Sequence, residues 1–257
     1  MTLTLDGKVA IVTGAGRGIG EATALRFAEE GAAVACVDVR GDAAASTAHA
    51  IERGGGRALA LAEDVSSDNG NQRMVDATVA GFGGLDVLHA NAAVQVMGRL
   101  EETTDEAWTR LYETNLRGVS LGITHALVKM RERGGGSIII TASLLGIVGD
   151  PDMPAYGAMK GGLRAMCRSV ATAYGPENIR CNTICPGDVD TAMNRDFFAH
   201  QPDPEVARQQ ILDHYPLRRF ASPRDVANVA LFLASDDASY LTGIDVVVDG
   251  GLLARIY

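Results

Sequence analysis

The stretch TGAGRGIG, Thr13 to Gly20, decides the fold of this chain. It follows a short apolar run and precedes a segment with helical periodicity. The common dinucleotide-binding fingerprint G-x-G-x-x-G does not fit it, because a count from Gly14 places Ile19 where the third glycine belongs. The glycines instead follow the spacing T-G-x-x-x-G-x-G, with Gly14, Gly18 and Gly20. The stretch is therefore either a nucleotide loop of different length or a strand-to-helix turn in a glycine-rich chain.

The segments around this loop have the layout of a phosphate-binding turn. Residues 8–13 are typical of a buried strand, and residues 19–32 carry a mostly apolar helical face. Glycines allow the backbone to approach a pyrophosphate, and free N–H groups at a helix N-terminus attract its charge. Asp38 ends the next predicted strand, about 20 residues past the loop, where an acid binds ribose hydroxyls. A helix-capping or solvated aspartate remains the alternative interpretation.

Strand and helix patterns alternate from one end of the chain to the other. This order predicts an α/β fold, a Rossmann-type doubly wound parallel sheet of about seven strands with helices on both faces. Without an evident linker, residues 1–257 are expected to form a single dinucleotide-binding and catalytic domain, with a substrate-loop or lid insertion at about 188–218. The predicted strands are 8–13, 33–38, 57–65, 85–93, 137–143, 179–187 and 244–251, and the predicted helices are 19–32, 42–56, 68–84, 103–136, 154–175 and 223–234.

Composition excludes several classes of partner. The 257 residues are 47% hydrophobic and carry a net charge of −9, with no basic run, so neither nucleic acid nor a membrane is an expected partner. The four cysteines have no His or Cys partner at ligand spacing, so we expect no metal site and reduced thiols. The first twelve residues lack the features of a signal peptide. A cytoplasmic location is therefore expected.

Four polar residues form a candidate catalytic set. In the segment YGAMK, Tyr156 and Lys160 are four residues apart on a predicted helix, which places phenol and ammonium on one face. Such a pair alone is common and usually lies on an amphipathic surface. Ser143 ends the fifth predicted strand, and Asn115 lies within the long helix predicted at 103–136. The four together point to a site rather than to a surface pair.

At this point the chain resembles the short-chain dehydrogenase/reductase family, in its form of about 250 residues. TGAGRGIG matches the cofactor loop of that family, and EDV, NAA, TN, TAS, YGAMK and PGDVDT follow in the order that the family shows. The resemblance covers essentially the whole chain. It implies catalysis by Asn115, Ser143, Tyr156 and Lys160, and cofactor binding by Gly14, Arg17, Gly18, Ile19, Gly20, Asp38, Asp64, Val65, Asn91, Tyr156, Lys160, Pro186, Gly187, Val189 and Thr191.

The implied reaction moves a hydride between a carbinol carbon and a nicotinamide. Tyr156 would exchange the alcohol proton, and Lys160 would favour the phenolate and bind ribose hydroxyls. Ser143 would hydrogen-bond the substrate oxygen, and Asn115 would hold a water in a proton relay to Lys160. The competing interpretations are a strand-end hydroxyl that bonds backbone for Ser143 and an ordinary polar helix residue for Asn115.

Two positions depart from the pattern of the family. Ala93 replaces the usual glycine after Asn91, so the backbone there is expected to avoid positive φ or to be strained. Gly16 stands where serine is frequent, so a hydroxyl contact to the loop or the phosphate is expected to be missing. Neither change removes a group of the catalytic set.

The segments that line the substrate in the family are largely apolar here. An apolar secondary alcohol or ketone, cyclic or aryl-bearing, fits them better than a phosphorylated or carboxylate substrate. The same side chains could equally belong to the core. The predicted pocket residues are Val94, Val96, Leu144, Leu145, Met193 and Phe197.

Two other functions remain open. A 3-oxoacyl-carrier-protein reductase would need a local basic patch for an acidic carrier, and Lys129, Arg131 and Arg133 could supply it. A nicotinamide-cofactor sensing module would need no catalysis, yet the Ser, Tyr and Lys set is whole. NAD is the expected cofactor and NADP the less favoured one, because Asp38 opposes a 2′-phosphate. The resemblance also implies a homotetramer.

Overall fold

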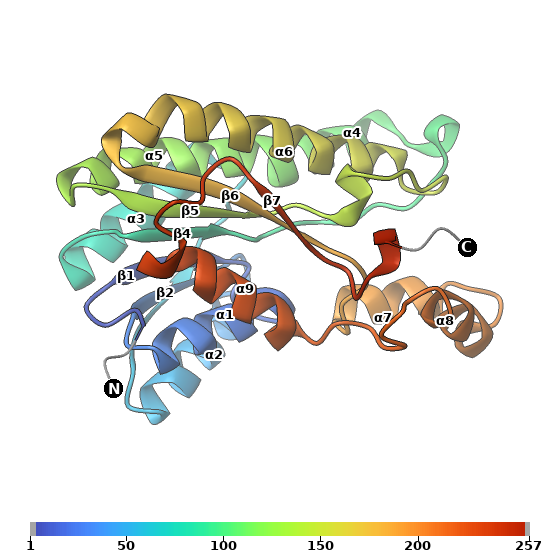
Figure 1. The fold of residues 1–257 in the computed structure, drawn as a ribbon, viewed down its shortest axis with the longest axis horizontal. Coiled ribbons are helices and arrows are strands. Elements are labelled where there is room, and N and C mark those ends of the chain that lie inside the picture. Colours follow the sequence, from blue (N-terminus) through green and yellow to red (C-terminus); the bar gives the residue numbers. More distant parts are fainter. Residues whose placement is uncertain (1–3, 255–257) are drawn as a thin grey trace.

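The computed structural model describes residues 4–254 and contains one sheet of seven parallel strands (Figure 1). The spatial order is β3-β2-β1-β4-β5-β6-β7, so the direction in which strands are added reverses beside β1. The predicted doubly wound fold is confirmed, with β1 and β4 at its switch point. The strands are β1 (Val9–Thr13), β2 (Ala33–Asp38), β3 (Arg57–Ala62), β4 (Val87–Ala90), β5 (Gly136–Thr141), β6 (Ile179–Pro186) and β7 (Asp245–Val248).

Helices cover both faces of the sheet, and each face has its own apolar cluster. Phe27 and Ile51 pack with Leu233 on one face, while Met74, Ile123 and Leu163 pack on the other. The central strands are buried on both faces, which explains their continuous apolar runs. One face carries α1 (Gly18–Glu29), α2 (Gly41–Arg53) and α9 (Pro223–Ala234), and the other carries α3 (Asp68–Phe82), α4 (Asp105–Leu111), α5 (Gly118–Glu132) and α6 (Pro154–Tyr174).

The prediction of one long α-helix over 103–136 is wrong. A π-helical turn at Tyr112–Arg117 separates α4 from α5, and α5 ends at Glu132. Turns of this kind insert a residue into the helical ladder and frequently mark functional sites. Here the turn contains Asn115, which is completely buried and bonds the backbone of Val94 across the layer. One inserted residue rotates the apolar stripe without ending the helical pattern, so the sequence pattern alone predicts an unbroken α-helix.

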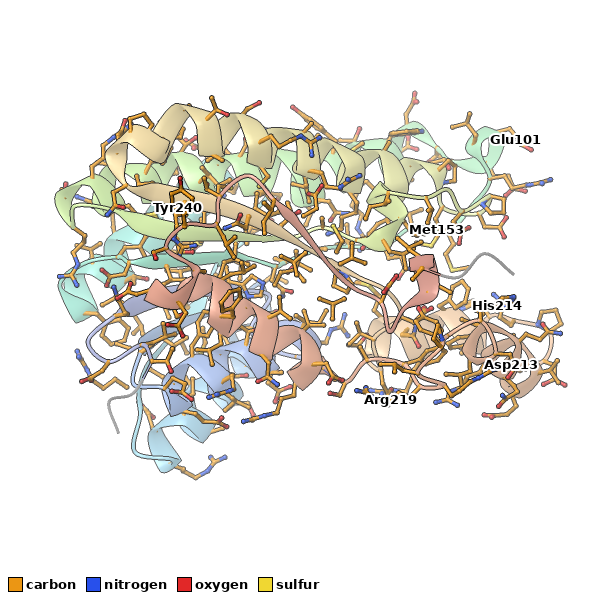
Figure 2. All side chains as sticks on the ribbon, viewed as in Figure 1. Glu101, Met153, Asp213, His214, Arg219 and Tyr240 are labelled. Carbon is orange, nitrogen blue, oxygen red and sulfur yellow. The ribbon has the colours of Figure 1, made fainter. Side chains whose placement is uncertain are left out.

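The predicted insertion at 188–218 forms two short helices beyond the carboxyl ends of the strands. They are α7 (Ala192–Ala199) and α8 (Pro204–Leu212). Figure 2 shows Asp213, His214 and Arg219 together on this part of the molecule, far from Tyr240 at the other end. The half-buried carboxylate of Asp188 fixes this segment to the rest of the domain, because it accepts hydrogen bonds from the Tyr215 hydroxyl (2.7 Å) and from Asn194 Nδ2 (2.9 Å).

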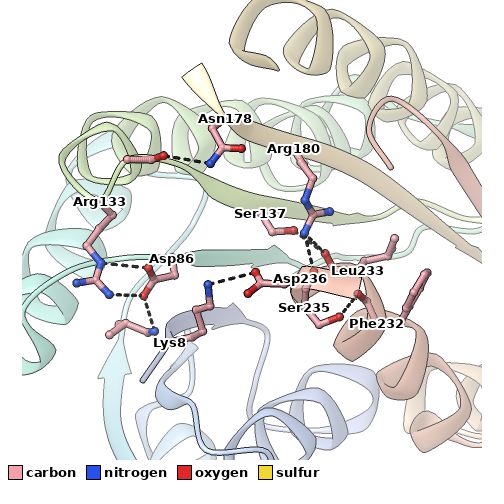
Figure 3. A network of polar contacts seen from close by, with 12 residues as sticks. Lys8, Asp86, Arg133, Ser137, Asn178, Arg180, Phe232, Leu233, Ser235 and Asp236 are labelled. Carbon is pink, nitrogen blue, oxygen red and sulfur yellow. Dashed lines mark hydrogen bonds and ion pairs between the residues drawn. The ribbon is translucent and has the colours of Figure 1, made fainter. Parts of the chain in front are cut away.

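At the opposite end of the sheet, a polar network closes the amino ends of the strands (Figure 3). Arg180 is its centre. The guanidinium donates to the carbonyls of Leu233 (2.8 Å), Ser235 (3.1 Å) and Leu241 (3.4 Å), which caps the C-terminus of α9. No carboxylate is within ion-pair distance in the described residues, and burial lowers the pKa of Arg180. The stabilisation therefore comes from hydrogen bonds to orphan carbonyls.

This network gives a stability prediction. Arg180→Met should lower the free energy of unfolding by about 2–3 kcal/mol, because buried carbonyls lose charged donors. Urea unfolding measures the change, and Arg53→Met is the control, since Arg53 is exposed at the end of α2 and makes no contact of this kind with residues 4–254. A loss equal to that of the control would contradict this role for Arg180.

Within residues 4–254, no helix is both long enough and apolar enough to span a membrane.

Candidate active site

A groove of about 610 Å³ runs along the carboxyl ends of the strands at the switch point. It brings together the glycine loop, the end of β2, the turn after β4 and the start of α6. Tyr156 and Lys160 lie at one part of it and Asp38 at another. Of the predicted cofactor residues, the groove is lined by Gly14, Arg17, Gly18, Ile19, Asp38, Asp64, Val65, Asn91, Tyr156, Lys160 and Thr191.

The glycine loop fits a dinucleotide by its shape and by its free donors. Gly14 and Gly18 adopt φ values of +66° and +60°, which strongly favour glycine. A Cβ on Gly20 would lie 2.1 Å from the carbonyl oxygen of Gly14, so this glycine serves close packing and does not line the groove. No side chain caps the N-terminus of α1, so its N–H groups are available to a pyrophosphate.

The structure explains why glycine rather than serine occupies position 16. Its N–H donates to Asp38 Oδ2 (3.0 Å), and a Cβ there would lie 2.6 Å from the Cβ of Ala43 and 2.7 Å from Asp38 Oδ2. A serine would therefore collide with the acid that the loop is built around. Ala93 is the second position that departs from the family pattern. It is not among the non-glycine residues with positive φ in residues 4–254, so its backbone avoids this strained region.

A threonine pair holds the floor of the groove. The hydroxyl of Thr13 accepts hydrogen bonds from the backbone N–H groups of Asn91 (2.9 Å) and Ala92 (3.0 Å). The hydroxyl of Thr141 bonds Asn91 Oδ1 (3.1 Å) and His89 Nε2 (2.8 Å). The ends of β1, β4 and β5 are thus fixed to one another directly under the predicted cofactor site. His89 is fully buried, and burial lowers its pKa to about 3, so it is neutral.

Tyr156 and Lys160 are buried together. Their exposed fractions are 9% and 2%, and Lys160 Nζ lies 5.5 Å from the centre of the Tyr156 ring. The ammonium donates to the carbonyl of Thr141 (2.7 Å). Burial raises the pKa of Tyr156 well above its usual range and lowers the pKa of Lys160 to about 8. The pair is therefore a phenol and an ammonium at neutral pH.

Ser143 and Asn115 lie beside the groove and are occupied by backbone contacts. Ser143 Oγ accepts from the N–H of Leu145 (3.1 Å) at the start of a short 3₁₀ turn. Asn115 accepts from the N–H of Val94 and donates to its carbonyl, both at 2.8 Å. Neither side chain bonds Tyr156 or Lys160 in residues 4–254. The water relay from Asn115 and the substrate contact of Ser143 stay predictions.

The predicted substrate residues divide between core and cavity. Met193 and Val94 line the groove, and Phe197 lines a second cavity beside it. Val94, Val96 and Leu145 also pack in the apolar cluster that contains Tyr156, and Leu144 is buried. Of the remaining cofactor residues, Pro186 pairs with β7, Val189 bridges to Ala221, and Gly187 packs against Tyr215.

Sequence reasoning missed two kinds of groove residue. Thr13 and Thr141 lie in the motifs TGAGRGIG and TAS, but a threonine that orients a neighbouring residue has no spacing pattern of its own. Arg110 lines the groove from α4, four residues before Thr114, which also lines it. On sequence alone Arg110 is an ordinary exposed helix residue, so only the tertiary arrangement identifies it.

The fold and the groove define a dinucleotide-dependent oxidoreductase. The family model described as enoyl-(acyl carrier protein) reductase matches residues 14–253. The chain is 38% identical over 251 residues to 2,5-dichloro-2,5-cyclohexadiene-1,4-diol dehydrogenase of Sphingobium indicum, with 98% of each chain covered. It is 40% identical over 248 residues to cis-4-hydroxycyclohexanecarboxylate dehydrogenase of Sinomonas cyclohexanicum, covering 96% of this chain and 97% of that one.

A solved structure supports the same family assignment as these relatives. The structure of levodione reductase superposes with a TM-score of 0.94 at 34% sequence identity, covering 98% of this chain and 100% of that chain. The chain belongs to the short-chain dehydrogenase/reductase family. It is an oxidoreductase that acts on CH–OH groups and uses a nicotinamide cofactor.

Proposed function

We propose that this enzyme is an NAD-dependent dehydrogenase of apolar, cyclic secondary alcohols and the corresponding ketones. The observation that carries the proposal is the groove itself, which has the buried Tyr156 and Lys160 at one part and Asp38 at another. Relatives named for cyclic alcohols support the substrate class. The apolar side chains beside Tyr156 support it independently.

In the proposed mechanism, Tyr156 takes the proton of the alcohol and Ser143 holds the alcohol oxygen. A nicotinamide cofactor held in the groove would supply the hydride acceptor. Lys160 keeps its ammonium beside Tyr156, held there by the Thr141 carbonyl, and offsets the charge of the phenolate. Because burial raises the pKa of Tyr156, this positive charge is needed for proton transfer near neutral pH.

The proposal is tested by a substrate screen. Purified protein is incubated with cyclic and linear secondary alcohols and either NAD or NADP, and absorbance of the reduced cofactor is followed. We expect turnover of cyclic alcohols with NAD. Turnover of primary alcohols only, or of no alcohol and no ketone, would contradict the proposal.

The acyl-carrier alternative gains no support from the cations predicted for it. Lys129 pairs with Glu132 (3.0 Å), Arg133 with Asp86 (3.1 Å), and Arg131 with Glu177. Each positive charge therefore already has a carboxylate partner. The patch lacks the free positive charge that an acidic carrier protein would need.

Assembly as a homotetramer in the cytoplasm is part of the proposal. Val119 on α5 and Leu163 on α6 are buried in the core, so they do not supply an interface. Exposed apolar side chains lie elsewhere, namely Val128, Phe232 and Val247 at 50%, 43% and 41% exposure. The free cysteines are all buried, as suits a reducing compartment.

Light scattering tests the assembly. At micromolar concentration we expect a mass four times that of the 26.9 kDa chain. A stable monomer at that concentration would show the expectation to be wrong. The measurement is repeated in high salt, which should have little effect if the contacts are apolar.

A further inference from the structure

A second cavity of about 420 Å³ adjoins the cofactor groove. The two cavities share the lining residues Arg17, Ala93, Val94, Arg110 and Met193, so the second is an outward extension of the first. Its other walls come from the turn after β4 and from α7. We call it the outer chamber.

Two unpaired arginines line the outer chamber. Arg17 comes from the glycine loop and Arg110 from α4, and neither guanidinium makes a hydrogen bond, ion pair or ring contact with residues 4–254. The chain has 32 acidic and 23 basic residues, so acids are available in excess. Most other arginines have a carboxylate or ring partner, as Arg73 and Arg164 show. The outer chamber is therefore distinctive, because two guanidiniums without a carboxylate or ring partner, from the glycine loop and from α4, line the same cavity.

The remaining lining is apolar or weakly polar. Val94, Met97, Met193 and Phe197 supply apolar surface, and Asp196 is the one acid that lines this chamber. Nδ1 of His200 lies 2.7 Å from the carbonyl of Asp196. Apart from His200, the ionisable lining consists of two cationic side chains and one acidic side chain. Such a chamber suits an apolar body that ends in a single anionic group.

We propose that the outer chamber binds a carboxylate carried by the substrate, with Arg110 as the principal contact and Arg17 as the second. The inference rests on the proposed function, since the alcohol of the same molecule would lie at Tyr156. It departs from the uncharged substrate that the sequence favours, because the substrate would be a hydroxy or keto acid with an apolar ring between the two groups. A guanidinium binds a carboxylate through two parallel hydrogen bonds, which explains why arginine rather than lysine suits this place.

A cofactor phosphate is the other anion that these arginines could meet. The uncapped N-terminus of α1 would hold the pyrophosphate, however, and Asp38 would hold the adenosine ribose. Arg110 belongs to a different element, α4, and lines the outer chamber as well as the groove. The substrate carboxylate is therefore the source that the geometry favours, and the experiment separates the two.

The experiment measures binding without turnover. Protein saturated with NAD is titrated by calorimetry with cyclohexanecarboxylate and with its neutral isostere cyclohexanecarboxamide. We expect the wild type to bind the carboxylate at least about tenfold more tightly, because charge-assisted hydrogen bonds are lost with the amide. Arg110→Gln should reduce this ratio below about threefold, and Arg110→Lys should retain part of it. Arg53→Gln is the matched control and should leave the ratio unchanged.

The second arm measures NADH affinity by fluorescence without any probe. We expect Arg110→Gln to change it by less than about twofold. The proposal would be overturned if the wild type bound the two probes equally, or if it did not bind the carboxylate at about 10 mM. So would an Arg110→Gln variant that loses NADH affinity and keeps the carboxylate preference, since the anion would then be a cofactor phosphate. Because no turnover is needed, this result is independent of whether the enzyme oxidises cyclic alcohols.

Discussion

Tyr156→Phe should lower kcat by a factor of roughly 10²–10⁴, the range typical of general acid–base catalysis, while cofactor affinity stays nearly unchanged. The substitution removes the hydroxyl oxygen that would exchange the proton in the proposed mechanism. The ring stays in its apolar cluster with Met153 and Met159, so the packing is preserved. Steady-state kinetics with the best alcohol from the screen, together with NADH titration, measures both quantities.

The environment of Tyr156 explains why a neighbour is needed. Burial raises the pKa of its phenol, so the unassisted group is a poor base at neutral pH. Lys160 has a pKa of about 8, so its ammonium is present below that pH and is lost as pH rises through it. The support that Lys160 gives to the phenolate in the free protein is therefore greatest below about pH 8.

Lys160→Ala is the companion variant for Tyr156→Phe. It should reduce the rate and also weaken cofactor binding, because one ammonium serves both in the proposed mechanism. The contrast between the two variants separates proton transfer from cofactor binding. If Tyr156→Phe keeps more than about a tenth of the activity, another group transfers the proton.

Much of the fold could be predicted from the sequence, because local and global signals agree. Alternating apolar runs and helical faces predicted all seven strands. The glycine spacing and Asp38 predicted a dinucleotide site, and the structure brings Asp38, Tyr156 and Lys160 to one cavity at the switch point. The π-helical turn at Tyr112–Arg117 escaped prediction, since inserting a residue barely alters apolar periodicity.

The parts of the site that the sequence did not predict depend on tertiary contacts. The absence of a side chain at Gly16 is explained only by how close Ala43 and Asp38 lie. Apolar residues after a motif can face core or cavity, and Val96 and Leu145 pack in the core cluster while Phe197 lines a cavity. The cavity role of Arg110 arises because the turn after β4 and α7 meet it from distant positions in the chain.

Asp38→Ala should lower the preference for NAD over NADP, measured as the ratio of kcat/KM values, by at least about tenfold. In the structure Asp38 is buried at 8% exposure, and its carboxylate accepts from the N–H groups of Gly16 and Arg40, each at 3.0 Å. Each carboxylate oxygen can accept two hydrogen bonds, so capacity remains for the ribose hydroxyls. The acid thus both shapes the loop and faces the predicted ribose site.

A 2′-phosphate at that site would meet a fixed negative charge. At an effective dielectric of about 20, unit charges about 4 Å apart interact by roughly 4 kcal/mol, and a residual ~2.8 kcal/mol corresponds to about a hundredfold preference. Arg40 offsets little of this, because its Nε already lies 3.5 Å from Asp38 and its side chain is half exposed. Arg17 is free but lines the outer chamber as well as the groove.

Because Asp38 also accepts a hydrogen bond from the Gly16 N–H, Asp38→Ala should lose affinity for both cofactors. The effect of the charge is therefore measured by the NAD/NADP ratio of kcat/KM and not by either kcat/KM value alone. Asp38→Asn is the matched control: it keeps the size of the side chain and removes the charge, so the ratio should fall there as well. A wild type that prefers NADP would contradict the assignment of Asp38. An unchanged ratio in both variants would do the same, because repulsion of the 2′-phosphate predicts that the preference disappears with the carboxylate.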